Sequence, residues 1–432
     1  MDSLEYHAEQ LDETFSNLKI NTKDSVDSDV LSGSLCSTKL AKAVRNSIPL
    51  ADLKSKGVFF TGDQLAHEAA TSIAQDLDLT SRVLDPACGS GNLLLAITKY
   101  LPICSSLRET LITWGQVLYG FEIDSGFVKL AKKRIVLEAI NRGAGIDISS
   151  LKEAEALLLN IKRRNGLTKT ISADIFTHII MNPPYNSRAN TENPLWQKKC
   201  LVNSAAIFCY KYLSNCKEGT KFVAILPEVL RSGNRYVNWR AYISSKISGS
   251  IELRGRFDTK ANVDIFLLSG IASSDTEEEV IWNKHLQDED SEVLENHFNV
   301  SVGPLVAYRD EKKGVKAPFI YPKNIEPWCK VSPRLEYRLF SGKLIKPPFV
   351  VIRRTSSPRD KVRAVASVIT GKEKVAVENH FIVCVPKTGK VSDCMKLMEA
   401  CKQSSTNDYL NDYIRCRHLT VSSIKSMPIY MR

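Results

Sequence analysis

One polar residue lies between an apolar run and two prolines, and it is the residue of this sequence best suited to chemistry. Asn182 follows the run His178–Met181 and precedes Pro183, Pro184 and Tyr185. Because two prolines fix the backbone and cannot continue a strand, we expect a rigid loop. The Asn182 side-chain carbonyl and the Pro183 backbone carbonyl would project into a cleft as acceptors, beside the aromatic face of Tyr185.

Two such acceptors suit an exocyclic amine. The nitrogen lone pair of this amine is delocalised into its ring, so the amine is a poor nucleophile. Acceptors aimed at both N–H groups stabilise the positive charge that develops on nitrogen during attack. This chemistry needs no metal, no covalent nucleophile and no general base. The motif by itself leaves the acceptor open, and an ordinary strand-ending turn is the alternative.

A glycine-containing segment upstream is suited to binding a ligand. It joins the apolar residues Val83–Leu84 to a helical pattern, and glycines let a backbone approach a ligand closely. A phosphate-binding loop is excluded, because no Gly-Lys-Ser or Gly-Lys-Thr follows. Glu122 ends a later apolar run and can accept bonds from ribose hydroxyls, whereas Asp124 is better placed as a helix N-cap. The candidate ligand residues of the segment are Asp85, Pro86, Ala87, Cys88, Gly89 and Gly91.

The elements that must position these residues alternate along the chain. The pattern predicts a short helix over 38–48, then strands over 82–84, 116–121, 178–181 and 221–226, with helices over 92–101 and 127–140. Such alternation indicates an α/β fold with a parallel sheet and right-handed crossovers. Ligands of such sheets bind at the carboxyl ends of the strands, where the candidate residues lie.

Charge divides the sequence further. Residues 301–432 contain 25 Lys and Arg against 11 Asp and Glu, a net charge of +14, within a chain of net charge +11. Such a basic region suggests a polyanionic partner, although an idle basic surface is the alternative. We therefore predict four parts: a flexible lead-in (1–34), a catalytic domain (35–272), an acidic linker or insertion (273–299) and a basic, mixed α+β domain (300–432). Within the basic domain we expect strands over 347–352 and 380–385 and helices over 391–402 and 407–414.

Several function classes do not fit. No apolar run is long enough to cross a membrane, and residues 1–19 do not resemble a secretory signal. The 11 cysteines and 7 histidines show no metal-ligand spacing, so no metal site is expected. Without a signal, the cysteines indicate reduced thiols in a cytoplasmic protein.

Together these motifs resemble the gamma group of DNA amino-methyltransferases, the modification enzymes of restriction systems. The resemblance is close over residues 54–270. Residues 56–66 look like the family's first cofactor motif and carry over Thr61, with Gly62 where the family usually has proline. The resemblance implies that Glu122 binds the cofactor ribose and that Ile123 packs against the cofactor adenine. Asp174 would bind the adenine amine, at an unusually short distance from Asn182, and Phe257 would stack on the target base.

The resemblance implies a Rossmann-like domain that uses S-adenosylmethionine to methylate adenine N6 in double-stranded DNA. The base would be flipped out, held between the rings of Tyr185 and Phe257. The basic domain would recognise the sequence, and a separate restriction endonuclease remains open as a partner. Ribosomal RNA, protein glutamine and cytosine N4 are alternative acceptors, and a non-catalytic DNA-binding subunit is another alternative. Candidate DNA contacts are Lys346, Arg353, Arg354, Arg359, Lys361, Arg363, Arg415, Arg417 and His418.

Overall fold

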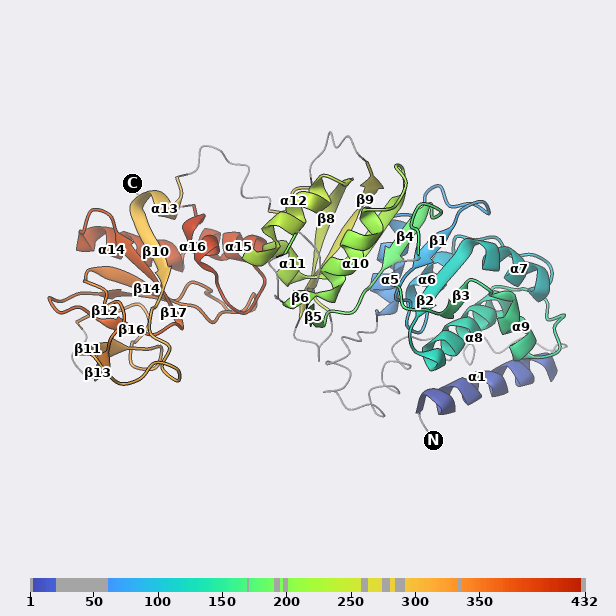
Figure 1. Cartoon of the computed structure of the whole chain (residues 1–432), viewed down its shortest axis with the longest axis horizontal. Helices are drawn as coiled ribbons and strands as arrows, with labels where there is room; N and C mark the ends of the chain where they lie inside the picture. The colour runs from blue at the N-terminus through green and yellow to red at the C-terminus, as the bar shows by residue number, and fades with distance from the viewer. Residues whose placement is uncertain are drawn as a thin grey trace. The chain divides into compact units, whose positions relative to one another are not determined.

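The computed structural model describes residues 3–20, 61–168, 171–189, 195–196, 201–257, 263–273, 280–283, 292–332 and 336–428 (Figure 1). The chain forms two compact units. The first comprises residues 1–231, 235–261 and 265–281, and the second comprises 232–234, 262–264 and 282–432. The helix expected over 38–48 lies outside the described residues. No helix among those described is both long and apolar enough to cross a membrane.

A seven-stranded sheet forms the centre of the first unit, in the order β3-β2-β1-β4-β7-β9-β8. Strands β1, β2, β3, β4 and β7 are parallel, and β9 runs antiparallel to β7. The bounds are β1 Val83–Asp85, β2 Leu118–Glu122, β3 Ile161–Arg163, β4 His178–Met181, β7 Lys221–Pro227, β8 Ile247–Arg256 and β9 Asp264–Ala272, with a small pair β5 Ser187–Ala189 and β6 Leu201–Asn203. These strands confirm the expected α/β fold.

Helices connect these strands. They are α1 Ser3–Ile20, α5 Asp63–Thr71, α6 Asn92–Thr98, α7 Leu107–Val117, α8 Ser125–Asn141, α9 Leu151–Leu157, α10 Ser204–Leu213, α11 Glu228–Ser232 and α12 Val237–Ser244, with a 3-10 turn at Asn234–Tyr236. The side chain of Asp124 accepts bonds from the backbone N–H groups of Gly126 and Phe127, so it caps α8 as expected. Helix α7 was not expected, and it takes up the start of the strand predicted over 116–121.

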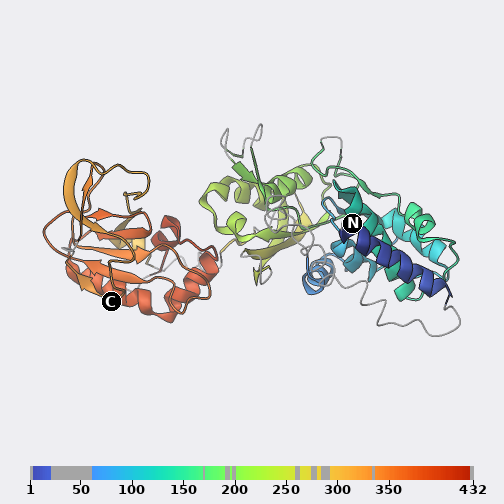
Figure 2. The same cartoon turned by 90° about the horizontal axis from the view of Figure 1, so that it is seen from below.

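The N-terminal lead-in, which the sequence predicts to be flexible or weakly helical, contains a helix. Residues 3–20 form α1, which packs on α8 (Figure 2). Leu11 and Phe15 are buried in this contact, and Lys133 of α8 pairs with Asp12 at 2.7 Å. The apolar spacing of i and i+4 along α1 was therefore a helix signal that the polar composition of the segment obscured.

The second unit contains a five-stranded sheet, in the order β10-β17-β14-β15-β12. It also contains a three-stranded sheet, in the order β13-β11-β16. The bounds are β10 Phe298–Val302, β11 Val315–Ile320, β12 Lys330–Val331, β13 Tyr337–Phe340, β14 Phe349–Arg353, β15 Ala366–Ile369, β16 Ala376–Val377, β17 Phe381–Pro386, α13 Leu294–His297, α14 Val391–Lys402, α15 Ser404–Tyr413 and α16 Val421–Lys425. This unit is mixed α+β, as predicted. It begins within the segment expected to be an acidic linker, because α13 starts at Leu294.

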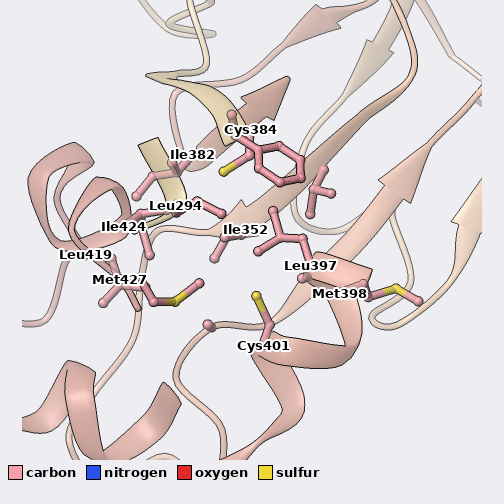
Figure 3. Packing of buried hydrophobic residues seen from close by; sticks show 14 of the residues in the cluster. Leu294, Ile352, Ile382, Cys384, Leu397, Met398, Cys401, Leu419, Ile424 and Met427 are labelled. Atoms are coloured by element: carbon pink, nitrogen blue, oxygen red, sulfur yellow. The ribbon is translucent and has the colours of Figure 1, made fainter. Parts of the chain in front are cut away.

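Both faces of the five-stranded sheet are buried. Val350 and Ile352 of β14 lie in a core with the helices, whereas Phe349 and Val351 lie in a second core on the opposite face. Figure 3 shows the first core, where Cys401 of α14 points among aliphatic side chains. Strands that are buried on both faces read as continuous apolar runs, which is why the sequence predicts them well.

Candidate active site

The three candidate motifs meet at one edge of the first sheet. Asp85 ends β1, Glu122 ends β2, and Asn182 directly follows β4. These strands are parallel neighbours, with Asp85 paired to Gly120 and Leu84 paired to Ile179. The strand order reverses between β1 and β4, and ligands of open α/β sheets bind at such a switch point.

The glycine loop after β1 has a backbone conformation that favours glycine at two positions. Gly89 has φ +49° and Gly91 has φ +83°, both in the left-handed region. A Cβ on Gly91 would lie 2.9 Å from the Cβ of Ala131, so this glycine allows α8 to pack closely. A Cβ on Gly89 would meet no heavy atom within 4 Å. The loop is thus packed on one side and open at Gly89.

Glu122 is held where the sequence places it. Its carboxylate accepts bonds from the backbone N–H groups of Gly89 at 3.1 Å, Ile123 at 2.7 Å and Asp124 at 2.9 Å. Burial raises the pKa of Glu122, and these N–H donors oppose that rise. Ile123 is 61% exposed, which is unusual for a large aliphatic side chain, and it offers an apolar surface beside Glu122.

Asp85 is a second carboxyl group at this edge and is almost fully buried. Burial raises its pKa to about 8, although the backbone N–H of Ala87 donates to it. Burial also raises the pKa of the Cys88 thiol well above its usual range. Cys88 is therefore a neutral packing residue and not a nucleophile. Two carboxyl groups, of Asp85 and Glu122, thus lie at this edge of the sheet.

The side chain of Asn182 makes hydrogen bonds at both ends of its amide. Its Nδ2 donates to Thr61 Oγ1 at 2.9 Å, and its Oδ1 accepts from the Tyr185 hydroxyl at 2.8 Å. Burial raises the pKa of Tyr185 well above its usual range, so the hydroxyl keeps its proton and can donate. The Tyr185 carbonyl in turn accepts from Asn203 Nδ2 at 2.9 Å. The loop is therefore fixed by side chains as well as by Pro183 and Pro184.

The two aromatic rings that the sequence suggests for the target base lie together. Phe257 follows β8, and its ring centre lies 6.2 Å from that of Tyr185, with the ring planes at 80°. The structure thus brings the two rings into an edge contact, and their packing against a target base stays a prediction.

Asp174, the residue expected to bind the cofactor adenine, does not lie at the sheet edge that carries Asp85, Glu122 and Asn182. It is exposed in the turn that precedes β4, so the strand separates it from Asn182. Asn165, which the sequence reasoning missed, follows β3 at the carboxyl edge instead. The adjoining Gly166 lies so close to the loop that a Cβ would be 2.1 Å from the Pro86 carbonyl oxygen. The short strand β3 before Asn165 was the signal that could have identified it.

The basic candidates of the second unit divide into two groups. Arg363 is 1% exposed and donates to the backbone carbonyls of Leu410, Ile414 and Cys416, so it is a structural residue. Arg353 donates to the carbonyls of Pro322 and Ile325, and within this unit Arg415 pairs with Asp264. Arg354 is partly buried, and its Nε donates weakly to the Leu419 carbonyl. The exposed candidates are Lys346, Arg359, Lys361, Arg417 and His418.

Comparison with known proteins identifies relatives of part of this chain. The chain is 29% identical over 137 residues to the type I restriction enzyme MpnII methylase subunit of Mycoplasma pneumoniae, and the alignment covers 31% of this chain and 22% of that protein. It is also 37% identical over 93 residues to the putative type II restriction enzyme and methyltransferase RM.MjaORFECS2P of Methanocaldococcus jannaschii. That alignment covers 19% of this chain and 8% of that protein. The chain thus matches about a fifth or less of these relatives' lengths.

Among solved structures, the fold resembles that of MmeI, a type IIL restriction-modification enzyme solved in complex with DNA. The TM-score is 0.53 at 10% identity, and the likeness covers 93% of this chain and 71% of MmeI. Residues 49–268, about half of the chain, match the family model for N-6 DNA methylases. This matched segment contains the glycine loop, Glu122, Asn182 and Phe257. The chain therefore belongs to the N-6 DNA methylase family.

Proposed function

We propose that this protein methylates adenine at N6 in double-stranded DNA, as the modification component of a restriction or defence system. The observation that carries the proposal is the position of Asn182, which lies at the same sheet edge as the glycine loop and Glu122. Family membership makes S-adenosylmethionine the cofactor, and this cofactor supplies the methyl group as an electrophile when it is bound. MmeI and the MpnII methylase subunit support a role in restriction-modification.

The chain's own residues would hold the cofactor and position the amine. Glu122 suits the ribose hydroxyls, Ile123 offers an apolar surface to adenine, and Gly89 leaves room for close approach of the backbone. Asn182 Oδ1 and the Pro183 carbonyl would accept the two N–H groups of the target amine. These acceptors would stabilise the positive charge that develops on N6. The base must first leave the duplex, because the loop cannot reach N6 within a stacked helix.

The proposal is tested by offering labelled S-adenosylmethionine to several acceptors in parallel: adenine-containing duplex DNA, DNA with cytosine as the amine-bearing base, ribosomal RNA and a glutamine-containing protein. We expect the label in duplex adenine, recovered as N6-methyladenine after digestion. Label in RNA or protein alone would refute the proposal. Sequencing of methylated adenines in a host that expresses the protein would then give the recognition sequence.

Binding of the cofactor should release a proton below about pH 8. Burial raises the pKa of Asp85 to about 8, so this carboxyl is protonated at neutral pH in the free protein. A cation bound at this edge favours the ionised carboxylate. Affinity should therefore rise by up to about tenfold per pH unit towards pH 8 and then level off. Calorimetry in buffers of different ionisation enthalpy measures the released proton.

The control for this titration is Asp85→Asn, which removes the carboxyl group but keeps its size. The variant should bind the cofactor more weakly and with little dependence on pH. Asp147→Asn, a change at an exposed carboxylate whose pKa is lowered chiefly by a hydrogen bond from the Arg108 backbone, should leave the titration unaltered. Undiminished proton release by Asp85→Asn would assign the titration to another group, such as Glu122.

Three exposed cations of the second unit should contribute to DNA affinity. Arg359, Lys361 and Arg417 are exposed, whereas Arg363 is buried. The triple replacement by glutamine should weaken DNA binding and reduce the slope of log K against log salt by up to about three, since each phosphate contact contributes about one. Cofactor affinity should not change. Fluorescence anisotropy over a range of salt concentrations measures both quantities.

A matched triple variant separates location from total charge. Lys312, Lys313 and Lys323 are also exposed in the second unit, and their replacement by glutamine removes the same charge. We expect the smaller loss of DNA affinity for this variant. Equal losses for the two triple variants would mean that DNA responds to net charge alone, and that Arg359, Lys361 and Arg417 have no special role.

A further inference from the structure

A chain of hydrogen bonds connects helix α8 to Asn182 through Asn92 and Thr61. Arg134 of α8 is 1% exposed and donates from Nη1 to the Ser90 carbonyl at 2.8 Å and to Asn92 Oδ1. Asn92 Nδ2 donates to the Thr61 carbonyl at 2.6 Å. Thr61 Oγ1 then accepts from Asn182 Nδ2 at 2.9 Å. Asn92 and Thr61 are themselves buried, so solvent does not substitute readily for any of these bonds.

The chemistry of its neighbours fixes the orientation of Asn92. A guanidinium has donors only, so the Asn92 atom that faces Arg134 must be the amide oxygen. A backbone carbonyl accepts only, so the Asn92 atom that faces Thr61 must be the amide nitrogen. A flipped Asn92 amide would set donor against donor and oxygen against oxygen. Asn92 thereby holds the Thr61 backbone in one place, beside the catalytic loop.

Asn182 has a similar need for one orientation. Rotation of its amide by half a turn would present NH2 instead of oxygen to the target amine, which also carries N–H groups. In the structure Thr61 Oγ1 accepts from Nδ2, and Oδ1 lies on the side of Tyr185. Because a threonine hydroxyl can also donate, removal of the Thr61 hydroxyl tests whether this bond sets the orientation. The Tyr185 hydroxyl, which occupies Oδ1 here, also lies 3.2 Å from the Ile225 carbonyl. It therefore has a second acceptor when the amine takes Oδ1.

We propose that Arg134, Asn92 and Thr61 are positioning residues that hold the Asn182 amide with its oxygen towards the target amine. Entry of the base transfers the Tyr185 hydroxyl bond from Asn182 Oδ1 to the Ile225 carbonyl, while the bond from Asn182 to Thr61 persists. This inference rests on the proposed function, because it assigns the orientation that amine methylation requires. A purely structural role would stabilise the fold and leave the turnover of folded protein unchanged.

Two replacements of Thr61 test the hydroxyl directly. Thr61→Val keeps the shape and removes the hydroxyl, whereas Thr61→Ser keeps the hydroxyl. We expect Thr61→Val to lower kcat, measured at saturating cofactor, by about 10–100-fold, as misplacement of a reacting group does, with KM for DNA near wild type. Thr61→Ser should restore most of kcat. A kcat near wild type in folded Thr61→Val, or an equal loss in both variants, would overturn the proposal.

Asn92→Asp tests the chain one bond further away. Aspartate keeps an oxygen for Arg134 but places a second oxygen against the Thr61 carbonyl, in place of the donor. The pair with Arg134 should preserve the fold, so this variant serves also if Thr61→Val does not fold. We expect a thermal midpoint close to wild type together with a reduced kcat. Wild-type turnover in Asn92→Asp would refute the role of Asn92.

A measurement without turnover separates this inference from the proposed function. The side-chain amide signal of Asn182 can be assigned in 15N NMR spectra by its loss in Asn182→Ala. Its hydrogens should exchange slowly with solvent in wild type and in Thr61→Ser, and faster in Thr61→Val and Asn92→Asp. If wild type methylated no DNA, the proposed function would fail, yet these exchange rates would still decide whether the chain holds Asn182. Equal rates in all four proteins would overturn the positioning role.

Discussion

Asn182→Ala is expected to slow methyl transfer to DNA by about 10²–10³-fold, the loss typical of removing one preorganised dipole from a charge-stabilising site. The replacement deletes Oδ1, which would accept one of the two N–H groups of the amine. The Pro183 carbonyl remains and accounts for residual activity. Single-turnover transfer of labelled methyl to duplex DNA measures the chemical step without product release.

Binding of both ligands should survive this replacement. Asn182 is not part of the glycine loop or of the edge at Glu122, so the cofactor Kd should stay near wild type. Asn215→Ala is a suitable control, because Asn215 is exposed on the same unit and its side chain donates to the nearby Lys211 carbonyl and Ser214 hydroxyl. Full activity of Asn182→Ala would contradict the proposed mechanism. Undiminished biological activity without any methyl transfer would favour the non-catalytic, DNA-binding alternative.

The elements beside the active site could be predicted from the sequence because several signals agreed there. The strand predicted over 178–181 matches β4 His178–Met181, since a strand buried on both faces is a continuous apolar run and Pro183 prevents its extension. Gly91 has a positive φ and lies against Ala131, so a glycine at this position indicates both the turn and the close packing of α8. Asp124 caps α8 and thereby leaves Glu122 to face the site.

Features that depend on tertiary context could not be predicted in this way. The sequence identifies Tyr185 and Phe257 as neighbours but does not determine that their rings are close to perpendicular. Asp174 lies in a sequence context like that of the expected motif, yet only the sheet shows that it precedes β4 while Asn165 follows β3. The positions of arginines within a basic region also say nothing about their burial, because a guanidinium can be satisfied by backbone carbonyls as well as by solvent.

Arg363→Met should destabilise the second unit strongly, by about 3–5 kcal/mol. The Arg363 side chain is 1% exposed and donates to Ser356 Oγ at 3.0 Å and to the carbonyls of Leu410, Ile414 and Cys416. Ile414 and Cys416 follow the end of α15, so no further turn of helix offers an N–H group to their carbonyls, whereas the Leu410 carbonyl also accepts from the Ile414 backbone N–H. Methionine retains the apolar stem but removes the Arg363 donors of the Ile414 and Cys416 carbonyls, and each unsatisfied buried acceptor costs about 1–3 kcal/mol.

Urea unfolding followed by circular dichroism measures this loss, and Arg359→Met provides the matched control. Arg359 is exposed in the same segment, so its replacement should change stability by no more than about 0.5 kcal/mol. The DNA affinity of the two variants should show the opposite pattern. Arg359→Met should weaken DNA binding by the folded protein, whereas the folded fraction of Arg363→Met, measured at low temperature, should bind DNA as wild type does. A stable Arg363→Met protein with weakened DNA binding would reverse this assignment and make Arg363 the phosphate contact that its sequence position suggested.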